Sequence, residues 1–183
     1  MVKPNVKFTY EDYVNLPESE ARRYELIAGE IHMVPSPTPN HQDCVFRIAK
    51  VLDDFVREHE LGSVHIAPLD VVLSKEDVLQ PDILFISKDR QSIITERNIQ
   101  GAPDLVVEVL SPGTADRDRT LKRTRYLKFG VREYWIVDPQ SKSIEVLRAG
   151  QTDFETVRVY SEGATATSPI LEGVQVDVVA VLA

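Results

Sequence analysis

The stretch that decides the fold is Leu105-Val-Val-Glu-Val-Leu-Ser-Pro112, an apolar run interrupted by one carboxylate and ended by a serine–proline pair. Such a run predicts a core β-strand. Because side chains alternate along a strand, Glu108 shares one face with Val106 and Leu110. An unpaired charge among apolar neighbours is costly, so a cation must meet Glu108 or its pKa must rise. The alternative is a buried Glu paired with an Arg that only organises the core.

The patterns on both sides of this run predict an α/β (α+β) protein. Helices are expected over a short segment capped by Thr9 and closed by Pro17, over 41–60 with Asn40 as cap and Gly62 as stop, and over 114–130. Strands are expected at 23–34 (a hairpin), 63–67, 70–73, 83–86, 105–110, 133–138, 143–147 and 154–160. This order favours a mixed central β-sheet flanked by helices. No repeat or Gly/Ser linker divides the chain, so residues 1–183 are expected to form a single domain.

Composition narrows the class of protein. The chain has 183 residues, of which 21 are Lys or Arg and 29 are Asp or Glu, and a formal net charge of −8. This balance disfavours a generic nucleic-acid coat protein, so a polyanion would have to meet a local basic surface or a bound metal. No apolar run could cross a membrane, and no Gly-x-Gly motif suggests a nucleotide cofactor. The single cysteine, Cys44, excludes a disulfide framework and fits the cytoplasm.

A second candidate carboxylate, Asp82, follows Pro81 immediately before the apolar run Ile83-Leu-Phe-Ile86. Proline fixes the backbone at a strand entrance, which holds Asp82 at a strand edge. A Pro-Asp pair is also common in turns, which is the alternative reading. On adjacent strands, Asp82 and Glu108 would form a hard oxygen site suited to Mg²⁺ or Mn²⁺, with the carboxylates within about 6 Å of each other.

The helix expected over 114–130 carries a stripe of Asp118, Lys122, Tyr126 and Phe129 at three- and four-residue steps. The aromatic pair indicates that the stripe faces inward, so Lys122 should reach toward the core. The alternative is an Asp118–Lys122 pair on the surface.

The same helix holds six basic residues against two acidic ones, Asp116 and Asp118. A local surplus of positive charge is the best candidate in the chain for a phosphate-contacting surface, and Arg119 and Arg123 are its expected nucleic-acid contacts. The alternative is an ordinary solvated helix face.

Pro81-Asp82, Glu108-Val-Leu and the later Lys122 together resemble the PD-(D/E)XK nuclease superfamily, and within it the bacterial Uma-type family of restriction endonucleases. The resemblance covers nearly the whole chain. It is carried by Tyr24-Glu-Leu-Ile-Ala-Gly-Glu30, the turn from Ser36 to His41, Gly101-Ala-Pro-Asp-Leu-Val-Val-Glu-Val-Leu-Ser-Pro112 and Gly130-Val-Arg-Glu-Tyr-Trp-Ile-Val-Asp-Pro139. It implies a restriction-endonuclease-like core and metal-dependent cleavage of phosphodiester bonds.

The resemblance also implies roles for single residues. Asp82 and Glu108, joined by the backbone carbonyl of Val109, would bind Mg²⁺ or Mn²⁺. The superfamily places a lysine two residues after the second acid, but this chain has Leu110 there. Lys122 is the expected displaced catalytic lysine, orienting water or stabilising the charged phosphate oxygens.

Two further residues are expected to assist. Glu25 matches an acidic position of the family and could hold the metal through water, the alternative being an exposed hairpin carboxylate. His41 begins the long helix and could be a base or a phosphate contact, or simply a capping residue.

These features predict a Mg²⁺-dependent endodeoxyribonuclease whose substrate is DNA. Cleavage of both strands needs two sites, so a homodimer is expected. The competing hypothesis is a catalytically inactive nuclease-fold module that acts in dimerisation or in binding a partner or nucleic acid; the net charge and Leu110 favour it.

Overall fold

The computed structural model describes residues 6–16 and 23–183. The helices are α1 (Tyr10–Val14), α2 (Pro39–Glu58), the 3₁₀ helix η1 (Lys88–Ile93), α3 (Ala115–Arg117), the π-helical turn η2 (Asp118–Lys122), α4 (Arg123–Phe129) and α5 (Val178–Leu182). The strands are β1 (Arg23–Ile27), β2 (Glu30–Val34), β3 (Gly62–Ile66), β4 (Val71–Ser74), β5 (Asp77–Leu79), β6 (Ile83–Ser87), β7 (Ile99–Gln100), β8 (Leu105–Val109), β9 (Glu133–Asp138), β10 (Ser143–Ala149), β11 (Phe154–Ser161), β12 (Thr165–Ala166) and β13 (Val176–Asp177).

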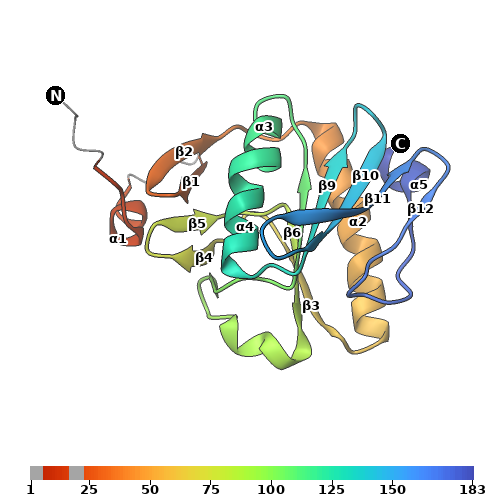
Figure 1. Cartoon of the computed structure of the whole chain (residues 1–183), viewed down its shortest axis with the longest axis horizontal. Coiled ribbons are helices and arrows are strands. Elements are labelled where there is room, and N and C mark those ends of the chain that lie inside the picture. The colour runs from red at the N-terminus through yellow and green to blue at the C-terminus, as the bar shows by residue number, and fades with distance from the viewer. Residues whose placement is uncertain (1–5, 17–22) are drawn as a thin grey trace.

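Two mixed sheets form the centre of the molecule (Figure 1). The larger has six strands in the order β11-β10-β9-β8-β6-β3, and only β8 and β9 run parallel. The smaller has five strands in the order β2-β1-β5-β4-β7. Helices flank these sheets, as the order of elements in the sequence predicts.

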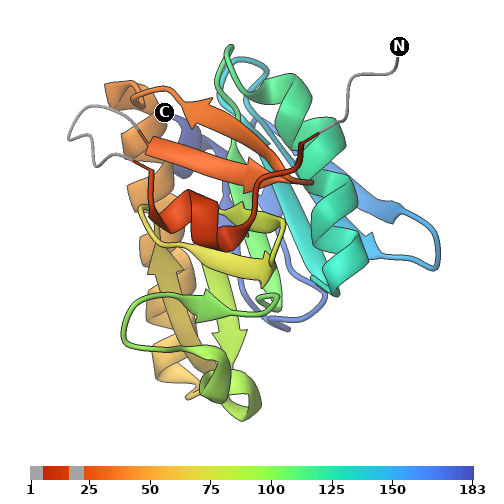
Figure 2. The same ribbon diagram turned by 90° about the vertical axis from the view of Figure 1, so that its left-hand side faces the viewer.

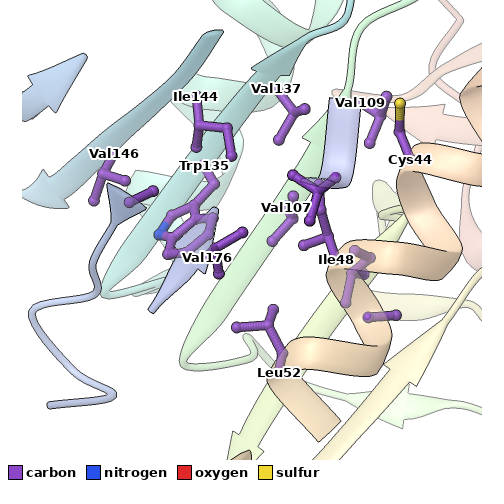
Figure 3. Close-up of a cluster of buried hydrophobic side chains, with 14 of the residues drawn as sticks. Cys44, Ile48, Leu52, Val107, Val109, Trp135, Val137, Ile144, Val146 and Val176 are labelled. Atoms are coloured by element: carbon purple, nitrogen blue, oxygen red, sulfur yellow. The ribbon is translucent and has the colours of Figure 1, made fainter. Parts of the chain in front are cut away.

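One face of the large sheet packs against α2. Cys44, Ile48 and Leu52 of that helix meet Val107 and Trp135 of the sheet in the main hydrophobic cluster (Figure 3). The helix places these residues at four-residue steps, so they form one apolar stripe. The odd-numbered side of β8 therefore faces the α2 core.

The opposite face of β8 packs beneath the continuous helical segment of α3, η2 and α4. Val106 lies there with Tyr126, Tyr134 and Ile136 in a second buried cluster. Figures 1 and 2 show this helical segment beside the β1–β2 hairpin. Glu108 therefore sits on the face where the hairpin and the helical segment meet.

Most expected elements are present, but their ends differ in instructive ways. Thr38, rather than Asn40, caps α2, because its side chain accepts from the amide of His41 and Pro39 takes the first helical position. The helix ends at Glu58, with His59 as its C-cap. Gly62 begins β3 instead, where a Cβ would lie 2.1 Å from a neighbouring carbonyl oxygen. Pro17 lies outside the described residues.

Candidate functional site

Glu108 lies in the middle of β8 and is almost wholly buried. Its Oε1 accepts two hydrogen bonds, from Tyr126 Oη at 2.6 Å and from Lys122 Nζ at 3.0 Å. A cation therefore meets the carboxylate, as expected, and it is a lysine rather than an arginine. Burial raises the pKa of Glu108 well above its ordinary value, against the opposing effect of Lys122.

Asp82 lies just before β6, which pairs antiparallel with β8 so that Ile83 stands opposite Val107. Continuing that register by one residue sets Asp82 opposite Glu108. The Oδ2 atom of Asp82 accepts a hydrogen bond from the Val109 amide at 2.8 Å, which ties the carboxylate to β8. Asp82 and Glu108 line the same pocket, in keeping with their expected position on one face of the sheet.

Lys122, at the end of the π-helical turn, is buried, with only 6% of its side chain exposed. Its Nζ lies 2.9 Å from Glu25 Oε1, 3.0 Å from Glu108 Oε1 and 3.4 Å from Asp118 Oδ1. These carboxylates raise the pKa of Lys122 well above its ordinary value although burial works the other way. The surface-pair alternative for Asp118 and Lys122 is therefore wrong.

Glu25 is also buried, so the alternative of an exposed hairpin carboxylate is wrong. It lies on β1 with its Oε1 accepting from the backbone amide of Gln80 at 2.9 Å as well as contacting Lys122. The hairpin thus contributes a carboxylate to a lysine that is nearly a hundred residues away in the sequence.

Asp118 is a fourth carboxylate at this place, which sequence reasoning did not assign to the site. It is buried on the π-helical turn and lines the pocket with Asp82, Glu108 and Lys122. Burial raises its pKa. Its Oδ1 accepts no hydrogen bond in the described structure, since the 3.4 Å approach of Lys122 is an ion-pair contact without hydrogen-bond alignment. π-helical turns occur frequently at functional sites.

His41 lies in the first turn of α2, with its Nε2 3.2 Å from Asp82 Oδ2. Burial disfavours the charged ring, but the Asp82 carboxylate and the Val109 carbonyl outweigh it and raise the pKa of His41. His41 lines the pocket too. The structure thus brings together five of the residues predicted from the sequence, Glu25, His41, Asp82, Glu108 and Lys122.

The pocket has a volume of about 60 Å³, and polar side-chain atoms without hydrogen-bond partners among the described residues lie around it. No hydrogen bond among the described residues reaches Asp82 Oδ1 or Glu108 Oε2. The side-chain atoms that are buried without a hydrogen-bond partner in the described structure all belong to residues of this region: His32 Nε2, His41 Nδ1, Gln80 Oε1, Arg117 Nη1 and Asp118 Oδ1. Such atoms call for water, an ion or a ligand.

The donor set suits a hard divalent cation. Within residues 6–16 and 23–183, no three Asp, Glu, His or Cys side chains are arranged as a ready-made metal site. Mg²⁺ usually takes one or two carboxylates and completes its shell with water and substrate phosphates. The free oxygens of Asp82 and Glu108, beside the Val109 carbonyl, fit that mode of binding.

The basic side chains expected to contact DNA lie elsewhere on the helical segment. Arg119 donates to Glu145 at 3.3 Å, and Arg123 forms a two-pronged ion pair with Asp153 at 3.0 Å. Neither lines the pocket. Their guanidinium groups are engaged by carboxylates of the β9–β11 region, an arrangement that favours the solvated-face alternative.

Sequence reasoning also missed the groups that hold the site in place. Tyr126 donates to Glu108, and the Gln80 amide donates to Glu25. The four-residue step from Lys122 to Tyr126 was a signal for the former. The latter is a backbone contact, which no side-chain pattern reveals.

Comparisons with known proteins agree with this fold. The family model Uma2, described as "Putative restriction endonuclease", matches residues 10–179. The chain therefore belongs to the Uma2 family of nuclease-like proteins.

Two individual proteins are similar to it. The crystal structure of "a putative nuclease belonging to DUF820 from Anabaena variabilis ATCC 29413" matches with a TM-score of 0.80 and 23% identity, over 96% of this chain and 97% of that one. The uncharacterized protein sll1609 of Synechocystis sp. (strain PCC 6803) is 22% identical over 132 residues, which cover 71% of this chain and 74% of the relative. At this identity the solved structure shows the fold alone.

No helix in the described part of the chain has the length and apolar character that crossing a membrane requires.

Proposed function

We propose that this protein is a metal-dependent endonuclease that hydrolyses phosphodiester bonds in DNA. Asp82 and Glu108, with the backbone carbonyl of Val109, would hold Mg²⁺ or Mn²⁺. The observation that carries the proposal is that these two carboxylates share a pocket, with one oxygen of each free of hydrogen bonds, beside the buried ammonium of Lys122.

The surrounding residues preorganise the two carboxylates. Tyr126 and Lys122 both donate to Glu108 Oε1, which fixes that carboxylate and leaves Oε2 free. The Val109 amide donates to Oδ2 of Asp82, which fixes this carboxylate and leaves Oδ1 free. Because preorganised groups need not rearrange as charge develops, such positioning favours catalysis.

The bound cation would supply an activated water and neutralise charge on the scissile phosphate. Lys122 would donate hydrogen bonds to the phosphate oxygens, where negative charge accumulates. Glu25 accepts from Lys122 at 2.9 Å and would aim the ammonium, which makes Glu25 a positioning residue. His41, in contact with Asp82, would hold or deliver a proton at Nε2.

The test is cleavage of supercoiled plasmid with Mg²⁺, with Mn²⁺ and with EDTA. Asp82→Asn and Glu108→Gln should abolish metal-dependent nicking, and should also remove the rise in unfolding midpoint that Mn²⁺ gives the wild type. Asp116→Asn is the matched control, because it removes an exposed carboxylate near the same site. Nicking that persists in both variants at the wild-type rate would overturn the proposal.

The competing hypothesis, an inactive nuclease-fold module, draws on Leu110 at the position where the superfamily has its lysine. Its signature would be DNA or partner binding with no cleavage under any divalent cation and no Mn²⁺ effect on unfolding. Both hypotheses place the protein in the cytoplasm. Both also allow a homodimer, which sedimentation of the purified chain tests, since paired sites are needed to cut two strands.

A further inference from the structure

A pair of nitrogen-bearing side chains lies where β2 meets the start of the helical segment. His32 of β2 stands opposite Glu25 across the hairpin. Arg117, the last residue of α3, places its Nη1 3.9 Å from Glu25 Oε2, which is too far for a hydrogen bond. The two side chains are 22% and 21% exposed, so each lies partly at the surface, although His32 Nε2 and Arg117 Nη1 themselves are buried. Figures 1 and 2 show the hairpin lying beside the helical segment.

Both side chains have unmet hydrogen-bonding capacity. Among the described residues, His32 Nε2 and Arg117 Nη1 are buried and have no hydrogen-bond partner. Glu25 does not meet this demand, since its Oε2 lies 3.9 Å from Arg117 Nη1, beyond hydrogen-bond distance, and its Oε1 is bonded to Lys122 and the Gln80 amide. Burial, and then the charge of Arg117, lower the pKa of His32, so near pH 7 the ring is neutral. The site therefore has one fixed positive charge and a neutral imidazole beside it.

The other arginines of the helical segment differ from Arg117. Each of them donates hydrogen bonds to a carboxylate: Arg119 to Glu145, Arg123 to Asp153 and Arg125 to Asp77. Arg117 is thus the arginine of residues 115–129 whose guanidinium is left without such a bond. It is also next to Asp118, and so next to the carboxylate–lysine cluster.

We infer that Arg117 and His32 form a subsite for a phosphate of the nucleic-acid backbone, adjoining the cleavage site. This inference rests on the proposed function, because it assigns the substrate contact of that same site. The guanidinium fork matches two phosphate oxygens, and phosphate contacts of this kind set the register of a bound strand. A bound phosphate would accept from both side chains at once.

The neighbours of the subsite distinguish a tethered phosphate from a free one. Two carboxylates border it: Glu30 is exposed and lies 3.9 Å from His32 Nε2, and Glu25 lies 3.9 Å from Arg117 Nη1. Their repulsion disfavours a free anion, whereas a phosphate in a bound strand is held by its other contacts as well. Inorganic phosphate at millimolar concentration should therefore compete poorly with DNA.

The experiment measures binding of a fluorescent mixed-sequence DNA duplex over a series of NaCl concentrations. Ca²⁺ replaces Mg²⁺ so that the carboxylates are neutralised. Arg117→Ala should weaken binding roughly 5- to 30-fold, the effect of losing one charge-assisted contact. It should also lower the salt slope by about 0.9, the value for one phosphate. His32→Leu should weaken binding by roughly 2- to 5-fold with little change in slope, because a neutral hydrogen bond is lost.

Variants of two other arginines show whether a loss of DNA binding is specific to Arg117. Arg57→Ala is the matched control, because Arg57 is 78% exposed at the end of α2 and pairs with Asp53; binding should be unchanged. Arg119→Ala tests the other face of the helical segment. A loss with Arg119→Ala and none with Arg117→Ala would overturn the subsite. If Arg117→Ala does not fold, Arg117→Gln is measured against the same criterion.

The outcomes separate the subsite from the proposed function. Wild-type protein that binds DNA, together with an Arg117→Ala variant of equal affinity and salt slope, overturns the subsite alone. Wild-type protein that binds no DNA overturns both. Inorganic phosphate that displaces DNA at millimolar concentration would overturn the assignment to backbone phosphate and indicate a free-anion site.

Discussion

Replacing Lys122 with methionine removes the positive charge that lies among three buried carboxylates. Methionine keeps most of the length and volume of the side chain, so the packing is nearly preserved. Three carboxylates, those of Glu25, Glu108 and Asp118, lie within 3.4 Å of the ammonium and would lose it together. The substitution therefore tests the electrostatics of the site rather than its shape.

The expected loss of stability follows from burial of the partners. Breaking a buried ion pair by removing one member costs about 3–5 kcal/mol, because it leaves a buried charge without compensation. For a chain of this size that is a fall in unfolding midpoint of roughly 6–20 °C. Burial already raises the pKa of Glu108 and of Asp118, and loss of Lys122 raises both further. A carboxylate with a raised pKa stabilises the folded state at low pH and loses that effect as the pH rises. The loss of stability caused by Lys122→Met should therefore be smaller at pH 5 than at pH 8.

Two measurements separate stability from catalysis. Thermal unfolding at both pH values gives the first, and Mg²⁺-dependent plasmid nicking well below the midpoint gives the second. Nicking should fall by about 10²–10³-fold, the usual effect of removing one electrostatic donor. The double variant Lys122→Met/Glu25→Gln removes one of the stranded charges, so it should recover part of the stability and none of the nicking.

The effect of Lys122→Met on stability and its effect on nicking can be refuted separately. A midpoint equal to that of the wild type at pH 8 would refute the buried ion-pair argument. Wild-type nicking by the folded variant would show that the lysine only supports the structure. Recovery of nicking along with stability in the double variant would lead to the same conclusion.

Three further perturbations have defined outcomes. Tyr126→Phe deletes the hydroxyl that donates to Glu108 and should cost about 1.5–3 kcal/mol in urea unfolding; an unchanged midpoint would refute that contact. Burial would raise the pKa of Asp77, but the hydrogen bond from Arg125 holds this pKa below its usual range. The Asp77–Arg125 pair therefore stabilises the fold above about pH 4, and its contribution decreases as the pH falls. Asp77→Asn should therefore cost about 3 kcal/mol at pH 7 and less at pH 3, and an equal cost at both would contradict the sign. Gly62→Ala should lower stability measurably, since the added methyl meets a carbonyl oxygen at 2.1 Å on a backbone with φ of +151°.

Local patterns in the sequence were enough to predict the frame of the molecule. The alternation along 105–110 predicted which residues of β8 share a face with Glu108 and which lie on the other face, and the two clusters confirm this grouping. The spacing of Lys122 and Tyr126 correctly predicted a buried lysine, because helical geometry sets one side of the segment toward the sheet. These features follow from the periods of strands and helices, which depend only on neighbouring residues.

Other features depended on which segments meet. The sequence set Asp118 on the same inward stripe as Lys122 but did not assign it to the site, and it did not indicate that a backbone amide at Gln80 holds Glu25. It placed Arg119 and Arg123 among the expected phosphate contacts, whereas their partners are acidic residues on strands and turns 20 or more residues later.

The sequence by itself therefore determined the apolar faces, the strand that carries Glu108 and the inward position of Lys122. Only the tertiary structure decided which charges pair: Lys122 with three carboxylates, Arg119 with Glu145, and Arg117 with no hydrogen-bonded carboxylate. Burial of an apolar face is nearly independent of its partner's identity, so a periodic pattern suffices to predict it. Charge pairing requires particular atoms within a few ångströms of one another, and that distance is set by the packing of β1, β8 and η2 together.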